Sequence, residues 1–546
     1  MIRILSLVLA LLALAAVPAA RAAEDGFVMF GGSIYVGAIG GVGNRPEALV
    51  VRGEKIVFTG SLAAARLKGK GLPEIDLKGA VAYPGFTDSH VHLTGVGLRE
   101  MTLNLDQVKS VAELVEAVQA YAAAHPGDEP IVGRGWIETH WPEGRFPNRA
   151  DLDAVSATRP IVLERSDGHA VVLNTAALRL ARITGATSDP AGGRIERDAA
   201  GEATGMLIES RLPPLSMATR RAALQKAVDL YASRGWTTAV NMSTDADDVK
   251  VLMAMAAEGT LPIRVDVFMT PEDSAEVLER GPYEDATGRV RVRGVKLYMD
   301  GALGSRGALL LKPYTDRPDT SGLQIARHDA TIAILKQALA VKAQIAFHAI
   351  GDKGNRLVLD WYQEVLGSDA NAARALNWRI EHAQIIDPRD IPRFASLGVV
   401  ASMQPSHAIG DLYFAPSRLG PDRLEGAYAW KSLLDRVATV VFGTDAPVEV
   451  GDPRIEFYAA VARKDLQGRS GPDWHPEQAI DRGSALTAFT LTPNHVDGGD
   501  CGVLVQSCPA DITVFSADIM TVPEADILKV KPVLTIVGGR IVHDGR

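Results

Sequence analysis

Two histidines separated by one residue follow an acidic residue in "PGFTDSHVHL", which spans residues 84–93. This segment ends a run that is typical of a β-strand, in which successive side chains point to opposite faces. His90 and His92 therefore point to the same side, and Val91 points to the other. Two imidazoles that converge on one point suit a divalent metal ion, whereas a packed core would have to supply hydrogen-bond partners for both rings. The spacing indicates a metal site, although His-x-His also occurs on exposed strands.

Further residues of metal-binding type stand near the ends of later strand-like runs. His348 lies in "AFHAIGD", His382 in "RIEHAQ" and Asp445 in "GTDAP". Taken singly, each has an ordinary explanation, because a histidine late in a strand is often hydrogen-bonded structure and an aspartate before a turn is often a cap. Together with the first pair they predict one shared site, since the carboxyl ends of parallel barrel strands open on the same face.

Lys296 stands inside the apolar run "RGVKLYMDG". An unpaired ammonium is costly to bury there and repels a metal ion nearby, so the side chain must be neutralised or modified. Reaction with carbon dioxide would give a carbamate, an anion able to bridge two metal ions. The alternative is an ion pair with a nearby carboxylate such as Asp300.

The middle of the chain alternates apolar strand-like runs with helical ones, which predicts an α/β fold, a (β/α)8 TIM barrel over residues 83–490. Residues 94–235 form a long insertion after the first strand, and we expect it to cap the barrel mouth. Short β patterns at 23–82 and 491–546 predict a small β-sandwich domain built from both chain ends. The eight runs are "VAYPGFTDSHVH", "WTTAVNM", "IRVDVFM", "GVKLYMD", "QIAFHAI", "WRIEHAQ", "GVVASMQ" and "TVVFGTDA".

The first residues have the pattern of a secretory signal peptide, predicted over 1–22. Arg3 precedes a short apolar run, and Ala20-Arg21-Ala22 forms a cleavage site, so we expect a mature chain in the periplasm or outside the cell. An uncleaved membrane anchor is disfavoured because the apolar run is short and small residues follow it. No later segment is long and apolar enough to span a bilayer.

Composition narrows the class of protein. Hydrophobic residues make up 47% of the 546 residues and charged residues 23%, so the chain can bury a large core. The net charge of −9 comes without a basic cluster, which argues against a nucleic-acid partner. The absence of sequence repeats argues against a structural or adhesive surface protein. Cys501 and Cys508 lie in one short stretch and form either a disulfide or two free thiols.

The chain resembles the amidohydrolase superfamily, in particular the metal-dependent hydrolases of the amidohydrolase-3 or YtcJ-like group. The motifs "DSHVH", "VKLYMDGALGSRGA", "HAIGD", "RIEHAQ" and "GTDAP" occur in family order, and "SDGHAVVLNTAAL" in the insertion is similar to a stretch of the YtcJ-like group. The resemblance covers nearly the whole mature chain. One loop departs from the family pattern, since "GVLVQSCPAD" carries Cys508 and Pro509 where a glycine-rich turn with a lysine is common.

The resemblance implies a centre of two divalent metal ions, most commonly zinc. The metals would share a hydroxide that attacks the scissile carbonyl. Asp445 would take the proton of that hydroxide as the catalytic base and deliver it to the departing nitrogen. One metal would be held by His90, His92 and Asp445, the second by His348 and His382, with N6-carboxylated Lys296 as the bridge.

Further predictions concern the surroundings of this centre. Three carboxylates next to the ligands are candidates for orienting their imidazoles: Glu381, Asp352 and Asp88. Three further residues are predicted to contact substrate: His169, Arg306 and Trp136. A loop salt bridge, a cap or a place in the core would explain each of these almost as well.

The leading hypothesis is an exported amidohydrolase that cleaves a non-peptide C–N bond in a small molecule, such as an N-acyl amine, a formamide or a cyclic amide. A deaminase on this fold would need a glutamate where Gly351 stands. A lactonase or phosphotriesterase could use the same centre and stays open as an alternative. A non-catalytic exported binding protein would be expected to have lost ligands, and none is lost. A homodimer is the assembly that the resemblance suggests.

Overall fold

The computed structural model describes residues 26–37, 45–138, 141–166, 168, 170–189, 193–208, 215–367, 374–471, 474–499 and 501–546. The predicted signal peptide lies outside these residues. The described chain divides into two compact units, one formed by Leu93–Ala227 and the other by the residues up to His92 together with Val228–Arg546. No helix in the described ranges is long and apolar enough to cross a membrane.

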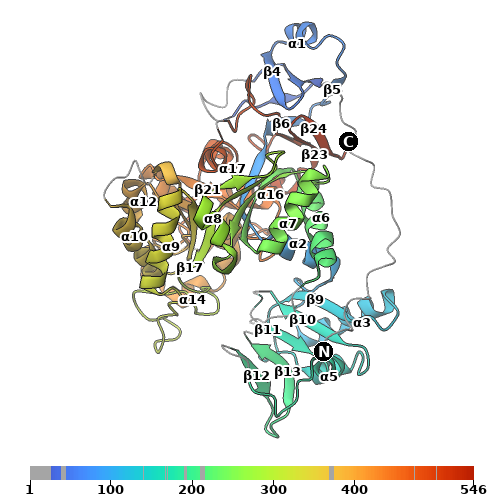
Figure 1. The fold of residues 1–546 in the computed structure, drawn as a ribbon, viewed down its shortest axis with the longest axis vertical. Coiled ribbons are helices and arrows are strands. Elements are labelled where there is room, and N and C mark those ends of the chain that lie inside the picture. Colours follow the sequence, from blue (N-terminus) through green and yellow to red (C-terminus); the bar gives the residue numbers. More distant parts are fainter. Residues whose placement is uncertain are drawn as a thin grey trace. The chain divides into compact units, whose positions relative to one another are not determined.

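Eight parallel strands of the second unit form a barrel, which confirms the predicted TIM-barrel fold (Figure 1). Their order is β21-β20-β19-β18-β17-β15-β14-β7, and short β16 (Tyr283–Glu284) pairs with β17. The barrel closes between its last and first strands, where His92 N donates to Ala446 O at 2.8 Å and Asp445 N to His90 O at 2.7 Å. The strands are β7 (Phe86–Val91), β14 (Trp236–Thr244), β15 (Arg264–Met269), β17 (Val290–Tyr298), β18 (Gln344–Ala349), β19 (Arg379–His382), β20 (Val400–Met403) and β21 (Val440–Phe442).

Helices cover the strands because each has an apolar stripe. On α9 (His328–Val341), Ile332, Leu335 and Ala338 are buried at helical spacing, and the helix packs on β18. The strands are covered on both faces and read as nearly continuous apolar runs, as parallel strands do. The other helices of this unit are α7 (Ala246–Ala257), α8 (Ala275–Arg280), α10 (Asp352–Leu366), α12 (Ile391–Leu397), α13 (Pro405–Asp411), α14 (Ala415–Leu419), α15 (Trp430–Asp435), α16 (Pro453–Ala462), α17 (Arg482–Phe489), α18 (Leu491–Val496) and, beyond the barrel, α1 (Leu62–Lys68).

The chain ends build a β domain of two sheets, ordered β4-β3-β1-β5 and β2-β6-β22-β23-β24. In the second sheet β22 pairs antiparallel with β6, with Thr513 opposite Tyr83. One apolar core joins both sheets and contains Phe27 and Leu534. A disulfide links Cys501 to Cys508, which settles the two alternatives for this pair. The strands are β1 (Phe27–Phe30), β2 (Ser33–Ile34), β3 (Ala48–Arg52), β4 (Lys55–Gly60), β5 (Glu74–Asp76), β6 (Val81–Pro84), β22 (Ile512–Phe515), β23 (Pro532–Val537) and β24 (Arg540–Asp544).

The first unit corresponds to the predicted insertion and contains a sheet of its own, ordered β12-β13-β11-β10-β9-β8. The compact unit ends at Ala227, inside α6 (Met217–Arg234), and the second barrel strand begins at Trp236. Its proposed capping role stays a prediction. Its elements are α2 (Leu93–Met101), β8 (Leu103–Asn104), α3 (Val111–Ala124), β9 (Ile131–Trp136), α4 (Arg149–Asp153), β10 (Ile161–Arg165), β11 (Ala170–Leu173), α5 (Thr175–Ala181), β12 (Arg194–Arg197) and β13 (Ala203–Ile208).

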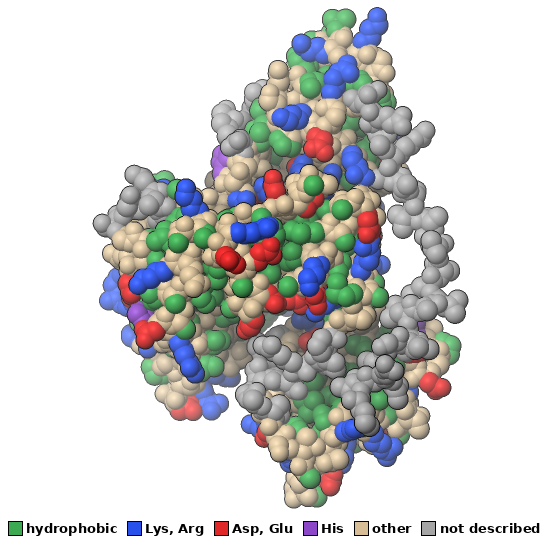
Figure 2. Space-filling model, viewed as in Figure 1, with side chains coloured by type: hydrophobic (Ala, Val, Ile, Leu, Met, Phe, Trp, Pro, Cys, Tyr) green, Lys and Arg blue, Asp and Glu red, His purple; other side chains and the backbone are tan. Residues whose placement is uncertain are grey.

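The charged side chains of the described residues are of mixed sign on the face drawn in Figure 2, where Lys and Arg are interspersed with Asp and Glu. The formal net charge of the whole chain is −9.

Candidate active site

All six predicted metal ligands lie at the carboxyl ends of barrel strands. His92 directly follows β7, His382 is the last residue of β19, and Asp445 comes three residues after β21. Lys296 and His348 lie within the last three residues of β17 and β18. The strand order places these ends around one mouth, so residues far apart in sequence converge there.

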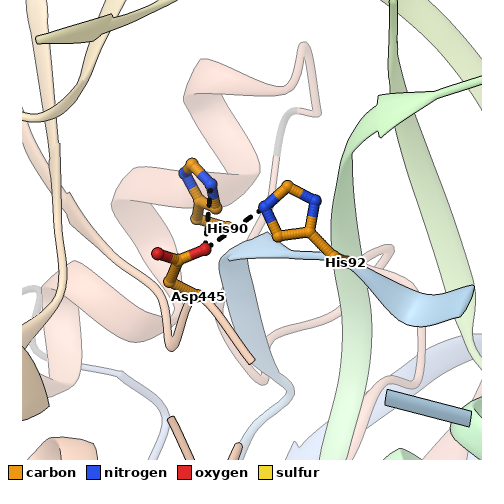
Figure 3. A group of neighbouring side chains, drawn as sticks. All are labelled: His90, His92 and Asp445. Atoms are coloured by element: carbon orange, nitrogen blue, oxygen red, sulfur yellow. Dashed lines mark ion pairs between the residues drawn. The ribbon is translucent and has the colours of Figure 1, made fainter. Parts of the chain in front are cut away.

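The best-defined group is formed by His90, His92 and Asp445 (Figure 3). Asp445 Oδ1 lies 3.4 Å from His90 Nε2 and 3.2 Å from His92 Nε2. Burial alone would raise the pKa of Asp445, but the neighbouring imidazoles of His90 and His92 hold it well below its usual range. The carboxylate is therefore ionised, which is the form that binds a metal or accepts a proton.

A second group shares the same aspartate and adds a residue that the sequence analysis missed, His407. Asp445 Oδ2 lies 3.6 Å from His407 Nε2 and 4.0 Å from His382 Nδ1. His407 comes four residues after β20 in "SMQPSHAIGD", at the end of the seventh predicted strand. That position relative to a barrel strand was the available signal.

The remaining ligands close the cluster. Lys296 Nζ lies 3.3 Å from His90 Nε2, and the rings of His348 and His382 lie 4.5 Å apart between centroids. The ring of His90 lies 4.8 Å from that of His382. The structure therefore brings together all the residues predicted to hold metal.

Three of the histidines are anchored through the ring nitrogen Nδ1. His90 Nδ1 lies 2.5 Å from Glu381 Oε2, His92 Nδ1 lies 3.1 Å from Met242 O, and the corresponding atom of His382 lies 2.9 Å from Gln404 Oε1. This anchoring is characteristic of metal-bound histidine, because it fixes the tautomer and the ring orientation. The donor set therefore fits a divalent metal centre.

Burial keeps the imidazoles of His90 and His348 neutral. It is the main cause that lowers the pKa of His90 to about 4 and the pKa of His348 to about 3, and the ammonium of Lys296 adds to both effects. A neutral imidazole is the form that binds a metal ion. The Nε2 atom of His348 is buried, makes no hydrogen bond to the described residues, and lies 3.5 Å from Asp300 Oδ1.

Lys296 has no anionic partner in the described part of the chain. Its side chain is 1% exposed, and no carboxylate of the described residues lies within ion-pair distance of Nζ. Asp300, the alternative partner, instead accepts hydrogen bonds from the backbone N–H groups of Leu309, Ile350 and Gly351. Burial lowers the pKa of Lys296 to about 8, so a substantial fraction of the side chain is the neutral amine at mildly alkaline pH.

Of the three carboxylates predicted to orient ligands, Glu381 contacts a ligand imidazole. It is fully buried, and although burial alone would raise its pKa, Arg379 and His90 lower that pKa to about 2. Arg379 Nε donates to Glu381 Oε1 at 2.5 Å, and its Nη2 donates to Ser89 O and Ser402 Oγ, both at 2.6 Å. The buried ion pair of Arg379 and Glu381 therefore fixes the carboxylate that contacts His90 Nδ1.

The other two carboxylates, those of Asp88 and Asp352, accept hydrogen bonds mainly from backbone N–H groups and not from the ligand imidazoles. Asp88 accepts hydrogen bonds from the backbone N–H groups of His90 and Thr444 and from the Tyr231 hydroxyl, which ties the first strand to the last. Asp352 accepts from the N–H groups of Leu311 and Lys353. Their effect on the centre is therefore to position the strand ends that carry the ligands.

We expect Glu381→Gln to weaken metal binding by about 10- to 100-fold, because it removes the charge that orients His90 and leaves Arg379 buried without its partner. Metal content after dialysis against graded chelator measures the effect. Glu364→Gln makes the same chemical change at a side chain that is 47% exposed and should bind metal like the wild type. Equal retention by both variants would contradict an orienting role for Glu381.

The structure does not support substrate contact for two of the three residues that were predicted to make it. Trp136 is fully buried in the core of the insertion, and its Nε1 donates to Leu163 O at 3.1 Å, which matches the core alternative and corrects the prediction. Arg306 forms a two-pronged ion pair with Asp316, with Nη2 at 2.9 Å from Oδ2, which matches the salt-bridge alternative. His169 lies outside the described residues.

Comparison with known proteins agrees with this site. A family model described as the amidohydrolase family matches residues 73–543. The putative amidohydrolase YtcJ of Bacillus subtilis is 32% identical over 524 residues, covering 92% of this chain and 97% of that protein. The N-substituted formamide deformylase of Arthrobacter pascens is 25% identical, with coverage of 91% and 95%. An uncharacterized metal-dependent hydrolase of Pyrococcus horikoshii, known as a crystal structure, is 28% identical with a TM-score of 0.77, covering 92% and 99%. The chain therefore belongs to the amidohydrolase family of metal-dependent hydrolases, enzymes that act on carbon–nitrogen bonds.

Proposed function

We propose that the protein is an exported hydrolase that cleaves a non-peptide, amide-like C–N bond in a small molecule, with N-substituted formamides as the first class to test. The observation that carries this is the convergence of four histidines, a lysine and an aspartate at the barrel mouth. A relative over most of the chain is named as a formamide deformylase, which supports the substrate class.

The residues divide into two sets for two divalent ions, for which we propose zinc. The first set is His90, His92 and Asp445. The second is His348 and His382, with Lys296 as an N6-carboxylated bridge. The burial of Lys296 and the absence of an anionic partner among the described residues support the carbamate, because it converts a buried cation into an anion. When bound, the ions would supply a water of lowered pKa and polarise the carbonyl of the substrate.

The geometry of Asp445 supports the role of catalytic base. Its Oδ1 faces His90 and His92, while Oδ2 faces the opposite side of the cluster. We propose that the carboxylate accepts the proton of the attacking water as that water adds to the carbonyl carbon. It then delivers the proton to the nitrogen as the C–N bond breaks.

A deaminase is disfavoured by the space at Gly351 as well as by its identity. A Cβ added there would lie 2.1 Å from Leu309 O, so a glutamate does not fit without moving the backbone. The Gly351 N–H also donates to Asp300 at 2.8 Å. The fold therefore uses this position for close backbone packing.

The amide and lactonase or phosphotriesterase alternatives are separated by matched substrates. Protein prepared with zinc and bicarbonate should hydrolyse N-benzylformamide at least 100-fold more efficiently, in kcat/KM, than a lactone or a phosphotriester of similar size. Removal of metal by a chelator should abolish the activity, and added zinc should restore it. Preference for the lactone or the phosphotriester would overturn the amide assignment in favour of that alternative.

We further propose export and cleavage near Ala22, supported by the pattern of Arg3, an apolar run and Ala20-Arg21-Ala22. Expression of the full chain in a Gram-negative host, followed by N-terminal sequencing of the periplasmic fraction, should find a mature chain that begins near Ala23. An intact N-terminus in the cytoplasmic fraction would contradict export.

A further inference from the structure

His407 reaches the metal cluster from a helix rather than from a strand. α13 (Pro405–Asp411) begins two residues after β20 ends, and His407 N donates to Gln404 O at 3.2 Å in its first turn. The residue is 8% exposed. Its ring lies nearly parallel to that of His382, with centroids 5.9 Å apart and an interplanar angle of 17°. The imidazole is therefore held among the proposed ligands.

The ring nitrogen that faces this cluster is unsatisfied. His407 Nε2 is buried and has no hydrogen-bond partner among the described residues. Asp445 Oδ2 lies at 3.6 Å and Glu449 Oε1 at 3.9 Å, both beyond hydrogen-bond distance. A buried polar nitrogen without a partner is costly, and such groups are found where a ligand completes the bonding.

The position of Asp445 indicates which atom of the substrate would accept a hydrogen bond from His407 Nε2. Its Oδ1 faces His90 and His92, whereas Oδ2 faces His407. Oδ2 is thus the oxygen available to exchange a proton with the reacting groups, and His407 Nε2 lies on that side of the carboxylate. An oxygen of the substrate's acyl group, as it becomes tetrahedral, would lie to one side of these two atoms, which are 3.6 Å apart, within hydrogen-bond reach of both.

We propose that His407 is a further catalytic residue, whose Nε2–H donates a hydrogen bond to an oxygen of the tetrahedral intermediate. This inference rests on the proposed hydrolysis of an amide. Such a donor acts most strongly when the charge on that oxygen develops in the transition state. His407 is therefore expected to affect turnover more than the retention of metal.

Metal ligation by His407 is the competing role, because its ligand atom lies within 4.8 Å of those of His382 and Asp445. The surroundings of the ring favour contact with substrate. His90, His92 and His382 each have Nδ1 anchored by a carboxylate, a carbonyl or an amide oxygen. In the described part of the chain, no side-chain hydrogen bond fixes the imidazole of His407 in this way, although metal-bound histidine almost always has one.

The test compares His407→Leu, which removes the donor, with His407→Gln, which keeps an N–H donor of similar reach. Methylphosphonate serves as a tetrahedral probe, and its Kd for the zinc-loaded protein is measured by calorimetry beside metal content. We expect unchanged zinc in both variants, a Kd raised about tenfold by leucine, and a smaller rise with glutamine. The kcat for N-benzylformamide should fall more than KM changes in the leucine variant.

Two results would overturn the inference. Loss of about one zinc per chain from both variants would make His407 a metal ligand, and an unchanged Kd with unchanged kcat would make it structural. The proposed function is tested separately by the wild type. If the wild type cleaves no amide but its methylphosphonate affinity still depends on His407, the hydrogen bond stands and the reaction assignment fails. Thermal unfolding of each variant, with rescue by glutamine, separates these effects from misfolding.

Discussion

Lys296→Ala is expected to reduce kcat/KM for a formamide substrate by at least about a thousandfold and to release about one of two metal ions. The buried side chain faces His90 Nε2 at 3.3 Å and is the proposed bridge between the two ligand sets. Alanine removes the bridging anion and leaves the two metals without a shared ligand. Elemental mass spectrometry and steady-state kinetics on protein prepared with zinc and bicarbonate measure both effects.

Two controls make this prediction specific to a carbamate. Lys336→Ala changes an exposed lysine on α9 and should leave metal content and kcat/KM unchanged. Added propionate should restore part of the activity of Lys296→Ala, because a small carboxylate fits the space that the side chain leaves. Labelled bicarbonate should also give a carbamate carbon signal in the wild type. Full metal content and activity in Lys296→Ala would exclude a bridging role.

Asp445→Asn is expected to lower kcat by about a thousandfold, within the range of general acid–base catalysis, because the amide cannot accept the proton of the attacking water. The isosteric change keeps an oxygen that can face His90 and His92, so we expect a smaller loss of metal than in Lys296→Ala. Kinetics beside metal content measure the difference between the two variants.

The matched control is Asp329→Asn, which makes the same change at a fully exposed carboxylate in the first turn of α9. It should match the wild type in kcat and in metal content. If Asp445→Asn retained more than a tenth of the wild-type kcat, another group would have to move the proton. His407, 3.6 Å from Asp445 Oδ2, is the first to examine in that case.

The barrel and its ligands could be predicted because two simple rules apply. Parallel strands buried on both faces read as apolar runs, and the residues at their carboxyl ends share one mouth. A polar residue such as Lys296 is conspicuous against that background. The same reasoning identified Glu381 as a neighbour of a ligand, because it stands beside His382 in "RIEHAQ".

The remaining differences concern residues whose local sequence is compatible with more than one place in the fold. His407 was missed because it lies on a helix after its strand, where the alternation of strand side chains no longer applies. Trp136 was assigned to a ligand pocket, but a tryptophan in the core has the same local sequence as one at a mouth. Asp300 was considered for Lys296, yet its partners are backbone N–H groups from distant segments.

The pairing of β22 with β6 has a consequence for synthesis of the chain. The strand that holds Tyr83 emerges early from the ribosome, whereas its neighbour with Thr513 emerges near the end of synthesis. Until then one edge of β6 is unpaired, although β2 pairs with the other, and the core around Phe27 lacks the side chains of Leu534 and its neighbours. Exposed strand edges and apolar surface are what aggregation and proteolysis act on. We therefore expect products of premature termination to be prone to aggregation and proteolysis even when every metal ligand has already been translated.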